Sequence, residues 1–525
     1  MPCYRKRSPK LRFQFVPAQR QSTLGGLPAL EALAQQFDLW NKVRRLPGLD
    51  PRVRRSHGYS PELIVAQILY CFCSGGVSLA DAERLNDEPR VRQLARVEKF
   101  ADQSQLGQWL RAQSNESIAA VWKLIAAFIG WVIARADAAR WTYAGRAEVF
   151  FDDTQIEVFG PTFEGAKLNY NGDLALSWQT FWFGPFLLAG ELGSPGDVSA
   201  ALSPWLQQHQ PFWKDRACDF LADSGSSSAA QLRDIDAAGF THGSVSDNQW
   251  TSVPERTAAA LPENVWSVAE PTRWRDGTEV TEHPAGIRHT PAESDFPFTL
   301  AVARWKKADD LFWRYSFVAH EGRRTDAGAV RARHRLKGGK EQMFKEVLRG
   351  LDLHHPPCES LTANRMFYAL GALAYNLMKA VQRLCLPDQC QSWTVATLLR
   401  QLVRLPATLV RHARRLVARV EVAVSWLGWW QTWEARWWTG AGASAGTASG
   451  CTPAEASRSA QTVRDSAAVR GAVSARPARR RAQTRPHAPD QRVGAPSPSS
   501  SPKGFLFSSR STRRPRAALA SSQTG

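Results

Sequence analysis

The first 140 residues carry the apolar spacing of short consecutive helices. Ser60-Pro61-Glu62 supplies an N-cap, a first-turn proline and a first-turn acid, and the apolar run Leu63–Cys73 ends at Gly75-Gly76. Ser78 can cap the helix that follows. Four arginines near these helices could form a DNA-reading module: Arg90, Arg92, Arg96 and Arg111. The pattern alone favours a plain helical bundle with solvated arginines.

From residue 147 the hydrophobic pattern becomes that of strands. Runs rich in β-branched and aromatic residues predict strands at 148–151, 156–159, 178–188, 218–222 and 241–246, with a helix at 231–238. Such alternation is typical of an α/β core with one central sheet. Between residues 250 and 330 the alternation stops, and apolar runs at 298–305 and 311–319 flank a polar turn. We therefore expect a β-rich insertion there.

After residue 330 the spacing is helical again. Helices are expected at 341–351 and 363–384, followed by a basic, tryptophan-rich helical end at 401–438. The longest apolar stretches, 118–134 and 366–378, are interrupted by Lys123 or are shorter than the roughly 18 residues that span a bilayer. They predict buried helices. Beyond residue 440 the chain is poor in aromatic residues and rich in Ala, Ser, Gly, Pro and Arg, which predicts a disordered tail.

The charge balance adds a class of partner. The 525 residues hold 67 Lys and Arg against 48 Asp and Glu, a formal net charge of +19. Residues 441–525 alone carry +11, from 13 Arg and one Lys against three acids. This excess favours a polyanion, either nucleic acid or a membrane surface. Eight scattered cysteines exclude a small disulfide scaffold and, with no apolar leader in the first 15 residues, predict a cytoplasmic protein.

Several catalytic signatures are incomplete. Gly338-Gly339-Lys340-Glu341 lacks the first glycine and the Ser/Thr of a P-loop, so ATP hydrolysis is not indicated. His320-Glu321 begins a zincin-like motif, but Arg324 stands where the second histidine is required. His354-His355 is compatible with a metal site and with ordinary polar surface.

Acids at the ends of two predicted strands are more informative. Asp152 and Asp153 follow a pair of phenylalanines, and Asp223 ends the run Phe220-Leu221-Ala222. A carboxylate in or beside a buried strand is costly unless it is paired or used. Strands of one sheet can deliver such acids to the same edge. The alternative is that each acid caps a helix or pairs with an arginine.

These acids carry a resemblance to a known family. Phe151-Asp152-Asp153-Thr154, Leu221-Ala222-Asp223-Ser224-Gly225 and Glu341 before an amphipathic helix resemble the Asp, Asp and Glu motifs of bacterial insertion-sequence DDE transposases. The spacings of 71 and 118 residues follow the family's order, and members with an inserted β-domain place it in the longer interval. Segments 102–106, 362–364 and 373–377 also resemble the family, so the likeness covers roughly residues 25–440.

The resemblance implies an α+β multi-domain protein with a ribonuclease-H-like α/β catalytic core. It implies cleavage and transfer of DNA strands at the ends of the protein's own insertion sequence, with two Mg²⁺ or Mn²⁺ ions. The metal ligands would be Asp152, Asp223 and Glu341, with Asp153 as the alternative first ligand. Two ions about 3.5–4 Å apart need carboxylate oxygens, and together they activate the nucleophile and stabilise the leaving oxygen.

The same resemblance implies partners and DNA-contacting residues. The partners would be the terminal inverted repeats and target DNA, with a homodimer in the DNA complex, no membrane, and association with the nucleoid when bound. The family signature Tyr-x2-Arg-x3-Glu-x6-Lys is altered here, because its places hold His334, Lys337, Glu341 and Leu348. We expect DNA contacts from His334, Lys337, Lys345 and Arg349, although a lysine cannot make the bidentate contact of an arginine.

The sequence thus predicts five parts. They are an N-terminal helical DNA-binding region at 1–140, the first part of the core at 145–249, the β-rich insertion at 250–330, the second part of the core with closing helices at 331–440, and the tail at 441–525. Two alternatives are a DNA-binding protein without catalysis, such as an inactive relic, and a structural nucleoid or membrane-surface protein. Convergence of Asp152, Asp223 and Glu341 would favour the transposase over both.

Overall fold

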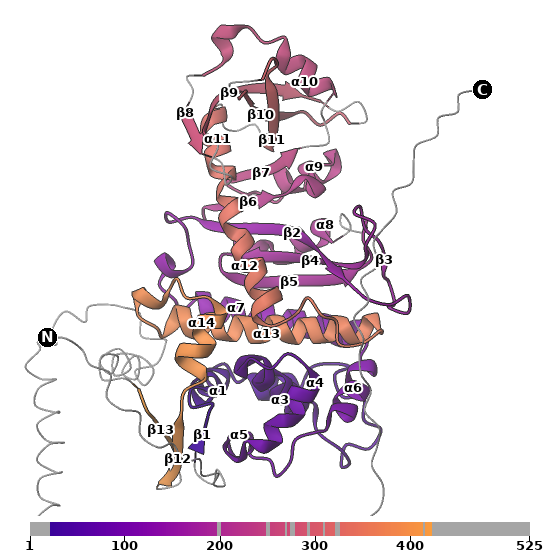
Figure 1. Ribbon diagram of the computed structural model, residues 1–525, viewed down its shortest axis with the longest axis vertical. Helices are drawn as coiled ribbons and strands as arrows, with labels where there is room; N and C mark the ends of the chain where they lie inside the picture. The colour runs from indigo at the N-terminus through magenta and orange to yellow at the C-terminus, as the bar shows by residue number, and fades with distance from the viewer. Residues whose placement is uncertain are drawn as a thin grey trace, which may run out of the picture. The chain divides into compact units, whose positions relative to one another are not determined.

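The computed structural model describes residues 21–196, 201–247, 252–267, 270–273, 279–290, 294–307, 310–320, 326–412 and 415–422. All of them belong to one compact unit, Met1–Gly446. The unit is mixed α+β, with a large central sheet and helices from both ends of the described chain (Figure 1). The tail at 441–525 and the tryptophan-rich segment at 426–438 lie outside the described residues.

The N-terminal part is helical, as its pattern predicts. Its helices are α1 (Leu27–Gln36), α2 (Leu39–Arg44), α3 (Pro61–Ser74), α4 (Leu79–Arg84), α5 (Pro89–Ala95), α6 (Gln103–Arg111) and α7 (Asn115–Ile133). Helix α3 begins after Ser60 with Pro61 in its first turn, and it ends at Gly75, whose φ of +78° favours glycine. Ser78 and Asp102 each form a capping box at the start of α4 and α6.

Helix α7 is long and apolar enough to cross a membrane, but 61% of its most apolar window is buried inside the protein. Helices α3 and α4 pass the same test only as a pair bent by 100°. Helix α7 packs against strand β5 (Phe186–Gly193) and against the long helix α13 (Leu361–Leu384). Its apolar surface therefore faces other parts of the protein, as in a core helix.

Within the described residues the central sheet has ten strands, and its order is β3-β4-β2-β6-β7-β11-β10-β9-β8, with β5 beside β4 (Figure 1). The strands are β2 (Ala147–Glu157), β3 (Lys167–Leu168), β4 (Leu174–Phe183), β6 (Cys218–Ala222), β7 (His242–Asp247), β8 (Glu270–Arg273), β9 (Glu279–His289), β10 (Phe298–Trp305) and β11 (Arg314–His320). Strands β2, β6 and β7 are parallel, and the other pairings are antiparallel.

Two strand predictions were wrong in extent. The run 178–188 is not one strand, because the chain reverses at Gly184-Pro185 between β4 and β5. Gly184 has a φ of +54°, and a Cβ there would lie 2.6 Å from the carbonyl oxygen of Trp141, so the turn requires glycine. The strands expected at 148–151 and 156–159 form the single strand β2, since the polar residues between them stay paired with β4.

The β-rich segment extends the sheet of the core. The hairpin expected from the runs at 298–305 and 311–319 is present as β10 and β11. Strand β11 pairs with β7, and β9 and β8 follow on the far side of β10. The segment also contains helix α10 (Ser252–Ala259), whereas α8 (Leu202–His209) and α9 (Ala229–Ala237) belong to the preceding part of the chain.

After the sheet come α11 (Ala327–His334), α12 (Leu336–Gly350), α13 and the short α14 (Val395–Leu398). Helix α13 packs against α3 and α7 and against β5. The side chain of Asn376 on α13 bonds to the backbone N–H and carbonyl of Leu187 at 3.0 and 2.8 Å. This polar link fixes the helix on a buried strand.

The helical end predicted from residue 401 was wrong over residues 407–412 and 415–420. These residues form strands β12 (Ala407–His412) and β13 (Arg415–Val420), which make a three-stranded sheet with β1 (Gln21–Ser22). Both segments contain β-branched residues such as Thr408 and Val417. Pairing with β1, from the other end of the described chain, fixes them as strands, a case of tertiary context overriding a local helical pattern.

Candidate active site

The first two predicted acids meet where the pairing of strands β2 and β6 ends, which is midway along β2 and at the carboxyl end of β6. The parallel strands pair up to Phe151 with Ala222, so Asp152 and Asp223 are the next residues on each. Side chains at equal positions of neighbouring parallel strands point to the same face. The Nζ atom of Lys337 lies 3.7 Å from Oδ1 of Asp152 and 3.5 Å from Oδ2 of Asp223. Both carboxylates therefore converge on one ammonium group.

Asp153 lies in a different environment from Asp152. Successive residues of a strand face opposite sides of the sheet. The carboxylate of Asp153 accepts a short hydrogen bond from the Ser177 hydroxyl and one of 2.8 Å from Nε2 of Gln155. Asp152, not Asp153, is thus the acid beside Asp223.

The two converging acids differ in exposure. The side chain of Asp152 is 16% exposed and that of Asp223 is 57% exposed. Burial raises the pKa of Asp152 to about 6, Lys337 opposes this rise, and the charge of Asp223 adds to it. Asp223 ends β6 and accepts a hydrogen bond from the backbone N–H of Ser224 at 2.9 Å. The site therefore has one wall inside the protein and one open to solvent.

Helix α12 carries the backbone of the third predicted acid one turn after Lys337. Lys337, which contacts both aspartates, stands in the first turn of α12, and Glu341 follows four residues later on that helix. Residues four apart lie on one face of a helix, one turn from each other. The structure thus brings together Asp152, Asp223 and the turn of α12 that carries Glu341.

The four residues expected to contact DNA have different positions. Lys345 and Arg349 are exposed and continue the row of α12 that begins with Lys337. His334 is buried, with its Nδ1 atom 3.0 Å from the Ser244 hydroxyl. Burial lowers the pKa of His334 to about 3, so the ring is neutral. Its position does not favour a direct contact with DNA.

Sequence reasoning missed a second pair of acids on the same strands. Glu148 on β2 pairs in register with Asp219 on β6, and they are 2% and 0% exposed. Nε of Arg146 donates to both oxygens of Asp219 at 3.0 Å, and Arg333 makes a short contact with the same carboxylate. Nζ of Lys340 lies 2.7 Å from Glu148. We call these five residues the buried ion cluster.

The buried ion cluster ties α11 and α12 to the sheet, because Arg333 belongs to α11 and Lys340 to α12. Lys340 directly precedes Glu341, so the cluster fixes the turn that carries the third acid. A sequence signal for it exists: Glu148 and Asp219 are separated by 71 residues, as are Asp152 and Asp223. Two pairs of acids with the same separation in the sequence suggest that the two strands lie side by side, with the acids of each pair at matching positions.

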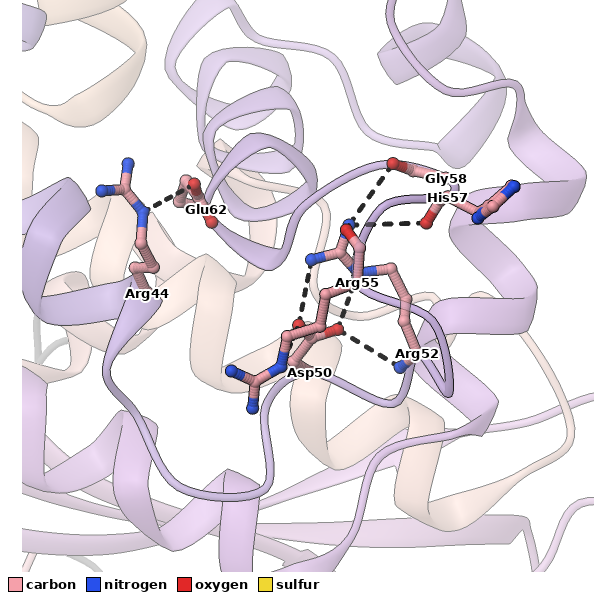
Figure 2. A network of polar contacts seen from close by, with 7 residues as sticks. All are labelled: Arg44, Asp50, Arg52, Arg55, His57, Gly58 and Glu62. Atoms are coloured by element: carbon pink, nitrogen blue, oxygen red, sulfur yellow. Dashed lines mark hydrogen bonds and ion pairs between the residues drawn. The ribbon is translucent and has the colours of Figure 1, made fainter.

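A basic loop lies between α2 and α3, at residues 45–60, and is held by its own contacts (Figure 2). Asp50 accepts two hydrogen bonds from the Arg52 guanidinium, at 2.8 and 3.0 Å, and Arg52 donates to the carbonyl of Arg55 at 3.1 Å. Arg45, Arg54 and Arg55 are exposed. Arg52 therefore shapes the loop, and Arg55 lies 3.9 Å from the same Asp50 carboxylate while its side chain stays 86% exposed. Arg45 and Arg54 present positive charge to solvent.

The four arginines expected to form a DNA-reading module also differ in exposure. Arg90 and Arg92 are partly buried, and they donate to the Gln93 side chain and the Glu98 carbonyl, both at 2.7 Å. Arg96 and Arg111 are exposed. Only the exposed pair is placed as the module would require.

Within the described residues, Asp352, His354 and His355 also come close enough to share a metal ion, with ligand atoms within 4.8 Å of one another. Oδ1 of Asp352 lies 3.3 and 3.2 Å from Nδ1 of His354 and His355. The group sits on the loop after α12, and His355 is exposed. The structure therefore keeps both sequence interpretations of His354-His355 open.

The acids at the sheet edge fit a hard divalent cation. Mg²⁺ and Mn²⁺ prefer oxygen ligands, and carboxylates supply both the oxygens and the compensating charge. Asp152 and Asp223 already converge on a cation, the ammonium of Lys337. The histidine group after α12 offers nitrogen ligands that suit softer transition metals.

Comparison with known families gives one match. Residues 302–426 match a family model described as "Transposase DDE domain group 1". The matched segment contains Lys337 and Glu341 and ends in the residues after β13; Asp152 and Asp223 precede it. No curated protein matches the chain.

Proposed function

We propose, on the premise that residues 302–426 are a DDE transposase domain of the insertion-element type, that the protein cleaves and transfers DNA strands at the ends of its own element. The observation that carries the proposal is the meeting of Asp152, Asp223 and helix α12. The family match covers α12, and the strands bring the two aspartates to it. A protein that only binds DNA gives no reason for acids to converge there.

The sheet supports a ribonuclease-H-like core in this proposal. The first acid stands midway along β2, the second directly follows the neighbouring parallel strand β6, and the third belongs to helix α12, whose lysines form ion pairs with acids of both segments. We propose that these parts form the catalytic core, with β8–β11 as the segment inserted between β7 and α11.

Asp152, Asp223 and Glu341 would hold two divalent ions, Mg²⁺ or Mn²⁺, in this core. When bound, such ions supply an activated nucleophile and charge stabilisation of the leaving 3′-oxygen. The chain's own part is to fix the oxygen ligands. Strands β2 and β6 set the distance between the aspartates, and the buried ion cluster holds the α12 turn beside them.

Positive side chains outside the core would bind the DNA phosphates. Lys345 and Arg349 lead away from the acids along α12, and the basic loop presents Arg54 and Arg55 on the helical part of the unit. Phosphate contacts give affinity and position without reading sequence. The homodimer and the recognition of terminal repeats stay predictions.

The test is cleavage of DNA that carries the ends of the protein's own gene segment, with and without Mg²⁺. We expect strand cleavage by the wild type that needs the metal and is lost in Asp223→Asn. Asp215→Asn is the matched control, because Asp215 is an exposed acid just before β6. DNA binding by a folded wild type without any cleavage would instead support the DNA-binding protein without catalysis.

A further inference from the structure

We propose that Lys337 is a built-in counter-cation of the candidate active site, which holds Asp152 and Asp223 together before a metal binds and weakens metal binding until DNA draws it away. The inference rests on the proposed function, and it adds a coupling between metal and DNA. Lys337 would then determine when the two aspartates can bind metal.

The position of the ammonium group is the first observation. It lies at ion-pair distance from both aspartates, 3.7 and 3.5 Å, and the lysine side chain is 12% exposed. A divalent ion bound between the same two carboxylates would stand a few ångströms from this positive charge. Like charges at such separation repel strongly where water is scarce. The metal and Lys337 therefore compete for the same pair of acids.

The attachment of α12 is the second observation. Lys340, three residues after Lys337, has its ammonium group 2.7 Å from the Glu148 carboxylate. Arg333, four residues before Lys337, forms an ion pair with the buried Asp219. The backbone of Lys337 is thus fixed on both sides. The ammonium group can therefore move away from the acids only if the Lys337 side chain rotates about its flexible four-carbon stem.

A DNA phosphate supplies the alternative partner. Lys345 and Arg349 stand on the same row of α12 and would bring a DNA strand along this helix. A phosphate near the site would accept the Lys337 ammonium and free the aspartates for metal. Metal and DNA binding would then strengthen each other by the same factor, as linkage requires. The protein would be loaded with metal mainly when DNA is present.

The test measures Mn²⁺ affinity in the absence of DNA, from the free Mn²⁺ seen by electron paramagnetic resonance. Lys337→Met keeps the length of the stem and removes the charge, and we expect it to bind Mn²⁺ roughly tenfold more tightly than the wild type. Lys337→Arg keeps the charge and should bind no more tightly than the wild type. Lys123→Met is the matched control, because Lys123 is exposed on α7.

A second arm measures coupling. A short duplex with the element's end should tighten Mn²⁺ binding in the wild type by more than in Lys337→Met. Thermal unfolding of each variant checks folding, and if Lys337→Met does not fold, Lys337→Gln takes its place in both arms.

Equal or weaker Mn²⁺ affinity in the folded neutral variant would overturn the inference. If that Mn²⁺ binding were still lost in Asp223→Asn, the proposed function would stand without the counter-cation role. Mn²⁺ binding that is absent from both the wild type and the neutral variant, with and without DNA, or that is indifferent to Asp223, would overturn both.

Discussion

Two pairs of acids stand four residues apart on the same two strands, and they have opposite surroundings. Glu148 and Asp219 are buried and meet the basic side chains of the ion cluster at short range. Asp152 and Asp223 lie where the β2–β6 pairing ends, and within the described residues their basic contact is Lys337 at 3.5 Å or more. The first pair is neutralised by the protein itself, whereas the second keeps spare negative charge.

The comparison separates a structural role from a chemical one. Burying a carboxylate is tolerable only when partners replace its hydration. The inner pair, Glu148 and Asp219, meets this condition, and its ion pairs fasten α11 and α12 to the sheet, in contrast to the outer pair, Asp152 and Asp223. The outer pair does not meet it fully, and one of its members is more than half exposed. A pair of acids with too little positive charge around it, one of them open to solvent, is suited to bind a cation.

The largest expected effect is on cleavage. Asp152→Ala, Asp223→Ala and Glu341→Ala should each lower the rate of DNA cleavage by about 10⁴-fold, ~5.5 kcal/mol, because a missing ligand removes charge compensation and alignment. DNA binding should persist, since affinity comes from Lys and Arg contacts to phosphates. Cleavage assays and thermal unfolding should be run on each variant beside Asp153→Ala. Full cleavage by a folded Asp223→Ala or Glu341→Ala protein would refute the mechanism.

The second effect is on stability, to which Asp219 should contribute more than Asp223, the reverse of their contributions to cleavage. Asp219→Asn should lower the free energy of unfolding by about 3–5 kcal/mol, because it leaves Arg146 and Arg333 without their shared carboxylate. Asp223→Asn should change it by less than about 1 kcal/mol, since the side chain is largely solvated. Urea denaturation of both proteins measures the difference. Equal losses would show that the two pairs have the same structural role.

A buried histidine whose pKa is lowered by burial sharpens the comparison. His209 is buried and stacks on Phe181, and burial lowers its pKa to about 4. Below pH 6.5 the unfolded chain takes up a proton that the folded protein refuses until about pH 4, so stability falls across this window by up to about 3 kcal/mol. His209→Phe should remove that part of the pH dependence. Unfolding curves at pH 7 and pH 4.5 that shift alike in both proteins would speak against it.

The smallest expected effect separates binding from chemistry. Arg54→Gln with Arg55→Gln should weaken DNA binding about tenfold at low salt and reduce the slope of log affinity against log salt by about 2. Arg135→Gln, an exposed residue after α7, is the control. Fluorescence anisotropy with duplex DNA at several salt concentrations gives both quantities. An unchanged slope would mean that the basic loop does not contact the phosphates.

Local signals in the sequence predicted local structure well. The caps at Ser60 and Ser78 marked the starts of two helices, and the apolar runs marked β6 and the β10–β11 hairpin. Hydrophobic runs could not show the reversal at Gly184, because strands on either side are equally apolar. Nor could they show that residues 407–420 pair with β1, since that pairing joins opposite ends of the described chain.

For the candidate site, the sequence predicted the acids but not their surroundings. Asp152 and Asp223 could be found because acids directly after apolar runs are conspicuous. Choosing Asp152 over Asp153 needed the pairing of Asp153 with Ser177 across β2 and β4. The buried ion cluster was missed because its members come from three distant parts of the chain and each is unremarkable alone. Lys337 was expected to face DNA, and its contact with both acids required the packing of α12.

The most direct test of the contrast between the pairs is to locate the metal on the chain. Fe²⁺ in place of Mg²⁺, with ascorbate and peroxide, generates hydroxyl radicals that cut the backbone close to the bound ion. Fragment masses should place the cuts beside Asp152, Asp223 and the first turns of α12, and excess Mg²⁺ should suppress them. Cuts at Asp352–His355, or a pattern unchanged in Asp223→Asn, would contradict the assignment of the outer acids as the metal site.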